Sequence, residues 1–185
     1  MAEEPVAVLD TNVLLTLATP VVDTRSVAPS GGDPLRAVLT GYTVNVPESV
    51  VGEVGDATGS DALLSAAADA VLRASDRLTT HAVEGRNEPA AVGLDGGELD
   101  AIALANDLGA DLFVTDEFNS TNYLLVAQAL ADRNTLYTTP HVLCSLARHG
   151  ALDRRSVDAL LTYFLETKQW SRTYVGALRR EYLDT

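Results

Sequence analysis

The sequence has little cysteine, almost no lysine and no long apolar run. Its 185 residues contain a single cysteine, Cys144, which excludes a disulfide framework and any zinc site built from several cysteines. No apolar stretch approaches the roughly 20 residues needed to cross a bilayer. The N-terminal segment is acidic and lacks the cationic region of a signal peptide. We therefore expect a cytoplasmic protein with no membrane association.

Basic residues are scarce compared with acidic ones. Lys and Arg number 13 against 26 Asp and Glu, which gives a formal net charge of -13, and Lys168 is the only lysine. A surface of this kind is typical of halophilic proteins, whose acidity serves solubility at high salt. The other interpretation is that the charge repels nucleic acids, because phosphate backbones normally bind Lys and Arg. On net charge alone, nucleic acid is an unexpected partner.

Short apolar segments alternate with helical patterns along most of the chain. Strand-like segments lie at 5–10, 42–46, 78–83, 111–116 and 135–137. Helices are expected at 12–17 (ending near Pro20), 35–40, from Pro47 onward, 61–75, 99–108 (ended by Gly109), 121–131, 140–149, 156–169 and 171–182. This alternation predicts an α/β fold with three layers, α/β/α, around a central, mainly parallel sheet. We expect residues 1–150 to form the main domain and residues 151–185 a helical extension packed on it.

Two aspartates directly follow strands that are expected to be buried. Asp10 ends the first of these segments and Asp116 ends the fourth. Ligands of open parallel sheets bind outside the carboxyl ends of the strands, so two carboxylates there indicate a site. Taken singly, Asp10 could instead cap the helix that follows it, and Asp116 could open a turn.

Three further acids lie on predicted helices. Glu53 is embedded among valines, where it is either a boundary residue or a site residue. Glu98 and Asp100 are about 200° apart on their helix and cannot share a face. Glu98 shares a small apolar row with Ile102 and should face the sheet, whereas Asp100 should lie nearer the rim. A capping interaction with Asp95 is the competing explanation for Glu98.

Together these acids indicate a definite chemistry. Carboxylates that converge without cysteine or paired histidine form an all-oxygen site, which suits Mg²⁺ or Mn²⁺. Clustered carboxylates repel one another and favour a bound cation. Such ions polarise phosphoryl oxygens, generate hydroxide and stabilise leaving oxygens, so the reaction class indicated is phosphodiester hydrolysis.

Three segments resemble the motifs of the PIN-domain family, the fold of metal-dependent ribonucleases that includes VapC-type toxins. They are VLDTNVLL, VPESVVGEV and GGELDAIALANDLGADLFVTDE, and the resemblance covers about residues 5–150. It implies that residues 1–150 are a PIN-like nuclease domain. Its catalytic and metal-binding acids would be Asp10, Glu53, Glu98 and Asp116, with Asp100 as an auxiliary metal ligand.

The resemblance also implies a biological setting. The spelling GELDAIALA and the C-terminal helices are similar to a PIN subgroup of unknown function. By implication the chain is a Mg²⁺- or Mn²⁺-dependent endoribonuclease acting on RNA. It would be the toxin-like component of a toxin–antitoxin pair, binding a small antitoxin, and would form a homodimer.

The chain departs from that subgroup after the fourth acid. The subgroup often has an arginine there, but this chain continues EFNSTNYLLVAQAL, with Thr121 near that place. Glu117, Asn119 and Asn122 could join the site as polar groups, although turn formation is the simpler interpretation. Asn12 could orient Asp10 or cap a helix.

Other functions remain open. A non-catalytic PIN-like nucleic-acid-binding or regulatory module would keep the acids without cleaving RNA. A dehalogenase-type phosphatase also begins with a strand-end aspartate, but it requires a second aspartate where this chain has Asn12. The arginines at 154, 155, 172, 179 and 180 form a modest basic cluster that RNA or an acidic partner could use, although solvated helix ends explain it as well.

Overall fold

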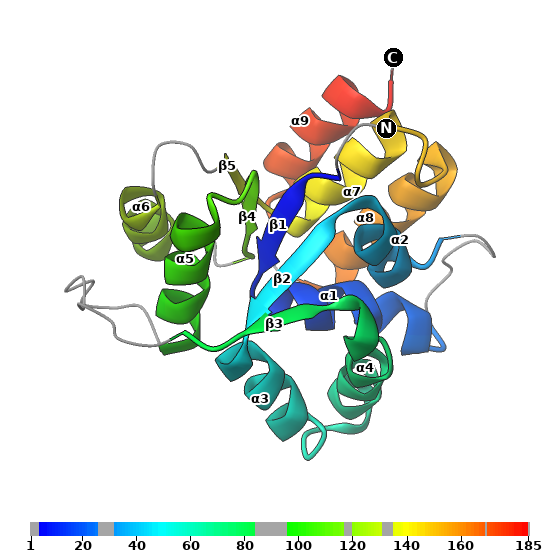
Figure 1. The fold of residues 1–185 in the computed structure, drawn as a ribbon. Helices are drawn as coiled ribbons and strands as arrows, with labels where there is room; N and C mark the ends of the chain where they lie inside the picture. Colours follow the sequence, from blue (N-terminus) through cyan, green and yellow to red (C-terminus); the bar gives the residue numbers. More distant parts are fainter. Residues whose placement is uncertain are drawn as a thin grey trace.

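A five-stranded parallel sheet forms the centre of the protein (Figure 1). The computed structural model describes residues 4–25, 32–83, 96–116, 120–130, 135–168 and 170–184. The strands run in the order β3-β2-β1-β4-β5, and every neighbouring pair is parallel. Their bounds are β1 Val6–Leu9, β2 Thr43–Pro47, β3 Thr79–His81, β4 Leu112–Val114 and β5 Thr135–Tyr137. The predicted α/β class and parallel sheet are confirmed.

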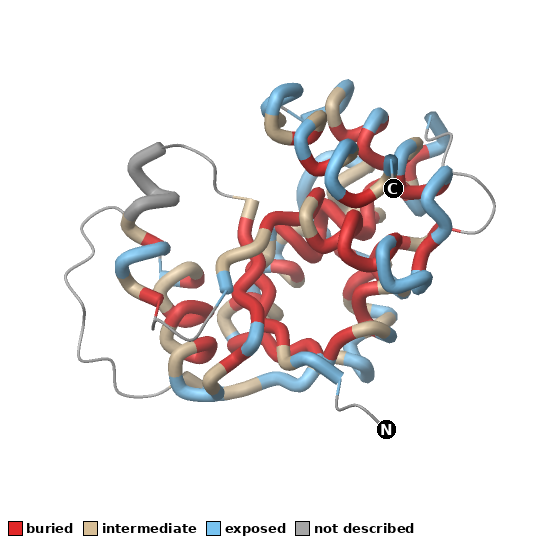
Figure 2. Tube along the Cα trace, turned by 90° about the horizontal axis from the view of Figure 1, so that it is seen from above, coloured by how far each residue is buried: buried red, intermediate tan, exposed pale blue. Residues whose placement is uncertain are grey.

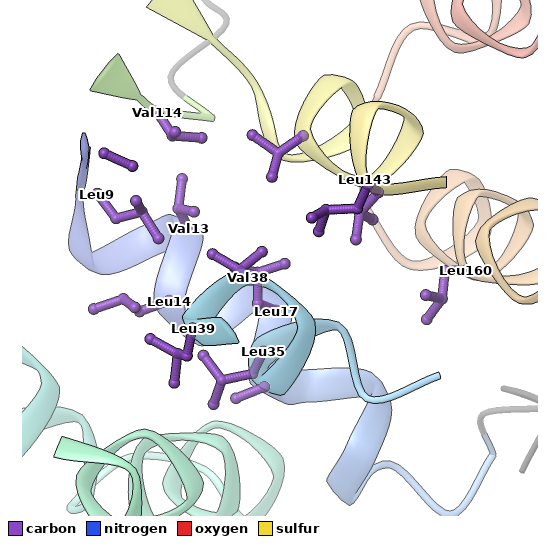
Figure 3. Close-up of a cluster of buried hydrophobic side chains, with 14 of the residues drawn as sticks. Leu9, Val13, Leu14, Leu17, Leu35, Val38, Leu39, Val114, Leu143 and Leu160 are labelled. Carbon is purple, nitrogen blue, oxygen red and sulfur yellow. The ribbon is translucent and has the colours of Figure 1, made fainter. Parts of the chain in front are cut away.

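Helices cover both faces of this sheet. In chain order they are α1 Thr11–Val22, α2 Pro34–Gly41, α3 Glu48–Ala57, α4 Ala62–Arg73, a 3₁₀ turn Ser75–Arg77, α5 Gly96–Leu108, α6 Ser120–Ala129, α7 Thr139–Arg148, α8 Arg154–Thr167 and α9 Arg172–Tyr182. Alternate strand residues face opposite layers. Val8 and Phe113 pack with α5 and α6, while Leu9 and Val114 face the larger layer that contains α1, α2 and α7 (Figure 3). This is the predicted three-layer arrangement.

Side-chain caps explain where many of the helices begin. Aspartate, serine or threonine oxygens accept hydrogen bonds from first-turn amides at six helices, the N-cap residues being Asp10, Asp33, Asp61, Thr138, Asp153 and Ser171. At the other end of α5, Gly109 adopts φ 60°, a left-handed conformation that ends the helix as the sequence predicts. Local capping therefore sets the residue at which each of these helices begins.

The expectation that the first helix ends near Pro20 is wrong. Helix α1 continues to Val22 with Pro20 inside it. Proline lacks an N–H donor and its ring crowds the carbonyl four residues before it, but in the last turn of a buried helix the burial of the apolar side offsets these costs. The helical bonding resumes at once, because the Asp23 N–H donates to the Thr19 carbonyl at 2.9 Å.

Helices α8 and α9 share the main hydrophobic core. Leu160, Phe164 and Val175 are fully buried in the same cluster as residues of α1 and α2, and buried segments lie near the C-terminus as well as in the centre of the molecule (Figure 2). The Tyr163 hydroxyl donates a 2.7 Å hydrogen bond to Asp23 at the end of α1. The extension at 151–185 thus packs on the rest of the chain, while the proposed boundary at residue 150 stays a prediction. In the described part of the chain, no helix is long and apolar enough to span a membrane.

Candidate active site

The acids at the strand ends lie at the point where the strand order reverses, beside the central strand β1. From the central strand β1 the chain leads through α1 and α2 to β2 on one side, whereas β4, on the other side of β1, leads through α6 to β5. Strand connections that diverge in this way leave a crevice at the carboxyl edge, where ligands of such folds bind. The Asp10 N–H donates to the Val114 carbonyl at 3.4 Å, so the ends of β1 and β4 are side by side.

Asp10 is a buried carboxylate with one oxygen satisfied and one not. Its side chain caps α1, because Oδ1 accepts a 2.7 Å hydrogen bond from the Val13 N–H. Only 5% of the residue is exposed. Oδ2 is buried and has no hydrogen-bond partner within the described residues. Helix capping therefore explains the position of Oδ1 but not the burial of Oδ2.

The pKa of Asp10 shows which charges surround it. Burial raises this pKa to about 7, and the nearby Thr115 side chain and the hydrogen bond from the Val13 amide oppose the rise. The negative charges of Asp116 and Glu98 add to it. Asp116 and Glu98 therefore both lie within electrostatic reach of Asp10, although the three acids come from separate parts of the chain.

The first residue of α7 holds Asp116 through two hydrogen bonds. Asp116 Oδ1 accepts a 2.9 Å hydrogen bond from the Thr139 N–H, and its Oδ2 accepts a 2.7 Å bond from the Thr139 hydroxyl. Thr139 is completely buried, so its position is set by core packing. The turn-forming interpretation of Asp116 misses this interaction, which joins the end of β4 to α7.

Glu53, on α3, contacts residues at the starts of α1 and α5. Its Oε2 accepts a hydrogen bond from the hydroxyl of Thr11, the residue after Asp10. A Cβ atom at position 97 would overlap Glu53 Oε1, so the carboxylate lies directly against the backbone of Gly97. Because Gly97 precedes Glu98, this close approach brings the predicted second and third acids to neighbouring positions.

The expectation that Asp100 lies nearer the rim than Glu98 is wrong. Asp100 is only 7% exposed, whereas Glu98 is of intermediate exposure. The buried row of α5 runs through Gly97, Asp100 and Leu104 as well as through the predicted apolar row, because the helix lies between the sheet and α3. The competing capping partner of Glu98, Asp95, lies outside the described residues.

The four acids approach one another without forming a ready-made ion cage. Among the described side chains, no group of three or more His, Cys, Asp or Glu residues is placed to hold a metal ion. Glu53 and Asp116 are instead bound by threonine hydroxyls. By chemistry the donor set is all oxygen and fits Mg²⁺ or Mn²⁺, and the buried, unpartnered Oδ2 of Asp10 is the atom most in need of a cation.

Sequence reasoning missed the residues that support the acids. Thr11 and Thr115 are adjacent in sequence to Asp10 and Asp116, and Gly97 is adjacent to Glu98, so proximity could have indicated them. Thr139 is far from every acid in the sequence and carries no such signal. Glu117 and Asn119, as well as the side chain of Asn122, lie outside what the structure describes, and a role for Asn12 stays a prediction.

The raised pKa of Asp10 predicts how the free energy of unfolding changes with pH. An unfolded aspartate titrates near its ordinary value of 3.8 and the folded one near 7, so the native state binds the extra proton between these limits. Stability from this group is therefore lost as the pH rises from about 4 to 7. Asp10→Asn removes that loss and retains an N-cap. In EDTA, its free energy of unfolding should therefore exceed that of the wild type by about 1 to 4 kcal/mol at pH 8 and by little at pH 4.

Urea unfolding of both proteins across this pH range, at constant high salt, measures the effect. If the free energies of unfolding of the wild type and Asp10→Asn changed with pH in parallel, Asp10 would not be a buried carboxylate with a raised pKa. Other titrating groups cancel in the comparison, since the two proteins differ only at residue 10.

Comparisons with known proteins add no assignment to this geometry. No match was found among protein-family models, curated proteins or solved structures. The resemblance of the three motifs to the PIN-domain family is therefore carried by the residues of this chain alone, and a function has to be argued from them.

Proposed function

We propose that the protein is a Mg²⁺- or Mn²⁺-dependent endoribonuclease with a PIN-like fold. One observation carries the proposal: Asp10 is buried at the end of β1 with Oδ2 unpartnered, within reach of the charges of Asp116 and Glu98. A protein gains no stability from such an arrangement, and a divalent cation would relieve it. Asp10, Glu53, Glu98 and Asp116 would hold the metal, with Asp100 as an auxiliary ligand.

The all-oxygen donor set supports this choice of ion. Mg²⁺ and Mn²⁺ prefer carboxylates, retain several waters and bind phosphate oxygens. When bound, such an ion supplies Lewis-acid activation of water and stabilisation of the leaving oxygen. By analogy with related nucleases the product would carry a 5′-phosphate.

Residues around the acids have distinct parts in this proposal. The α1 cap fixes the orientation of Asp10, and Thr139 positions Asp116 through two hydrogen bonds. Contact with Gly97 keeps Glu53 beside the start of α5. Because the described side chains form no ready-made metal group, we expect the Glu53 carboxylate to turn away from Thr11 when an ion binds.

The second candidate is a non-catalytic PIN-like nucleic-acid-binding or regulatory module. The same threonine contacts favour it, because Glu53 and Asp116 are already satisfied without a cation. The missing arginine after Asp116 points the same way. Such a module would keep the fold and the acids but would not depend on a divalent ion.

The biological setting follows from the motif resemblance alone. We propose a small antitoxin as protein partner, a homodimeric assembly and a cytoplasmic location. None of these is needed for the chemistry of the site, and each can fail without affecting it.

Cleavage of RNA by the wild type and by Asp10→Asn tests the proposed function. Asn retains the cap on α1 but cannot neutralise a cation, so we expect the cleavage rate to fall by about 100-fold or more while the fold survives. The assay uses a labelled RNA at high salt with Mg²⁺ or Mn²⁺, and EDTA should abolish the wild-type activity. Equal activity in the two proteins would refute the assignment.

A glycine pair tests the position of Glu53 without changing any acid. A methyl group at Gly97 would push the Glu53 carboxylate aside, whereas a Cβ at Gly96 meets nothing within 4 Å. Both positions lie in the first turn of α5, where alanine is tolerated. We expect Gly97→Ala to lower the cleavage rate by about 10- to 100-fold and Gly96→Ala to leave it nearly unchanged.

Thermal unfolding of both alanine variants is the companion measurement. Comparable stability together with unequal activity supports a positioned Glu53. If Gly97→Ala cleaved RNA as fast as Gly96→Ala, Glu53 would have no place in the site.

A further inference from the structure

An open groove between the start of α8 and the end of α9 gathers four arginines. Its volume is about 590 Å³, and its lining includes Arg154, Arg155, Arg179 and Arg180 together with Asp158 and Asp184. In Figure 1 these two helices lie against α7, apart from α3 and α5, which carry Glu53 and Glu98. The lining of the groove includes none of the four site acids, nor Thr11, Val13 or Thr139, which hydrogen-bond to them.

The groove belongs to a part of the chain in which basic residues outnumber acidic ones. Residues 1–147 contain 21 of the 26 acidic residues and only 6 of the 13 basic ones. Residues 148–185 contain 5 acidic and 7 basic residues, so this segment is net positive. An anion approaching the protein is repelled by most of the surface and attracted to this region.

Two of the four arginines are engaged within the protein. Arg179 forms a 2.9 Å ion pair with Asp158 and also donates to the Thr162 hydroxyl. Arg154 donates a 3.3 Å hydrogen bond to the Leu183 carbonyl. These contacts fix the two walls of the groove relative to each other.

Arg155 and Arg180 are exposed and have no hydrogen bond or ion pair to any described residue. The Arg180 guanidinium lies over Gly176, at 3.7 Å from where a Cβ would be, so the absence of a side chain there leaves room beside it. Arg154 and Arg155 occupy the first turn of α8, where a cation opposes the helix dipole. Folding alone does not favour this placement.

The chemistry of the groove suits phosphate. Arginine offers a planar fork of donors that pairs with phosphate oxygens, and two guanidinium groups without partners can bind successive phosphates. We propose that this groove binds the phosphate backbone of the RNA substrate at a segment away from the bond that is cleaved. The inference rests on the proposed function, since it takes RNA as the substrate. A protein of charge -13 needs such an anchor to retain RNA at all.

RNA binding by a charge-matched pair of double variants tests the proposal. Arg155→Gln with Arg180→Gln removes the two unpartnered groove cations, whereas Lys168→Gln with Arg172→Gln removes two exposed cations of the same region that do not line the groove. Net charge changes equally in both. The probe is a fluorescein-labelled stem–loop RNA of 40 nucleotides, measured by anisotropy in EDTA from 0.2 to 1 M KCl, with the RNA checked for integrity afterwards.

We expect the groove variant to bind about 10-fold more weakly at the lowest salt, with the slope of log Kd against log salt reduced by about 1.4 for two lost contacts. The control variant should stay within about two-fold of the wild type. Equal weakening in both variants would show only an effect of net charge and would overturn the proposal, as would unchanged binding in the groove variant. If the groove variant lost binding to a labelled oligoglutamate peptide but still bound RNA, the proposal would be overturned, and the groove would be assigned to an acidic protein partner.

The two proposals fail separately in this design. Binding in EDTA does not depend on cleavage, so an inactive acid site leaves the anisotropy result valid. Conversely, cleavage of a dinucleotide, whose single phosphodiester bond must lie at the acid site, should be the same in the groove variant and the wild type. A large loss of activity on this short RNA would place the arginines in the cleavage site and contradict a remote anchor.

Discussion

Burying a carboxylate beside other carboxylates costs free energy, and the site of this protein is built around one such group. Asp10 satisfies one oxygen by capping α1 and leaves the other buried without a partner in the described structure. Burial together with the charges of Asp116 and Glu98 raises its pKa to about 7. A capping residue alone has no need of this environment, because Asp61 and Asp153 cap α4 and α8 of the same chain from exposed positions. The unfavourable environment of Asp10 is thus specific to this position.

The sheet order explains why these particular acids meet. With β1 and β4 adjacent at the centre, the residues that follow them are neighbours, and the helices that start from this edge carry the remaining acids. Gly97 allows α3 and α5 to approach closely enough for Glu53 to lie against the backbone beside Glu98. The threonines at 11 and 139 hold two of the carboxylates in place. Fold and site are therefore coupled through a few short contacts at one end of the sheet.

Much of this could be predicted from sequence because the signals are local. The strand at 135–137 and the helix stop at Gly109 follow from residue type and spacing, and the placement of Asp10 and Asp116 follows from the general behaviour of parallel sheets. Tertiary packing decided the rest. Pro20 stays within a helix because that helix is buried, Asp100 is buried because α5 packs on two neighbours, and Thr139 reaches Asp116 only through the fold.

The net charge of -13 first argues against nucleic acid, but its distribution removes that objection. Part of the acidity is concentrated at the strand ends, where a cation would neutralise it, and the net positive C-terminal segment carries the arginine groove. The most direct test of the central claim is a crystal structure of the wild type soaked in Mn²⁺, with anomalous diffraction locating the ion. The account predicts a peak at metal–oxygen bonding distance from Asp10 Oδ2, shared with Asp116. Absence of a peak at these carboxylates at saturating Mn²⁺ would contradict it.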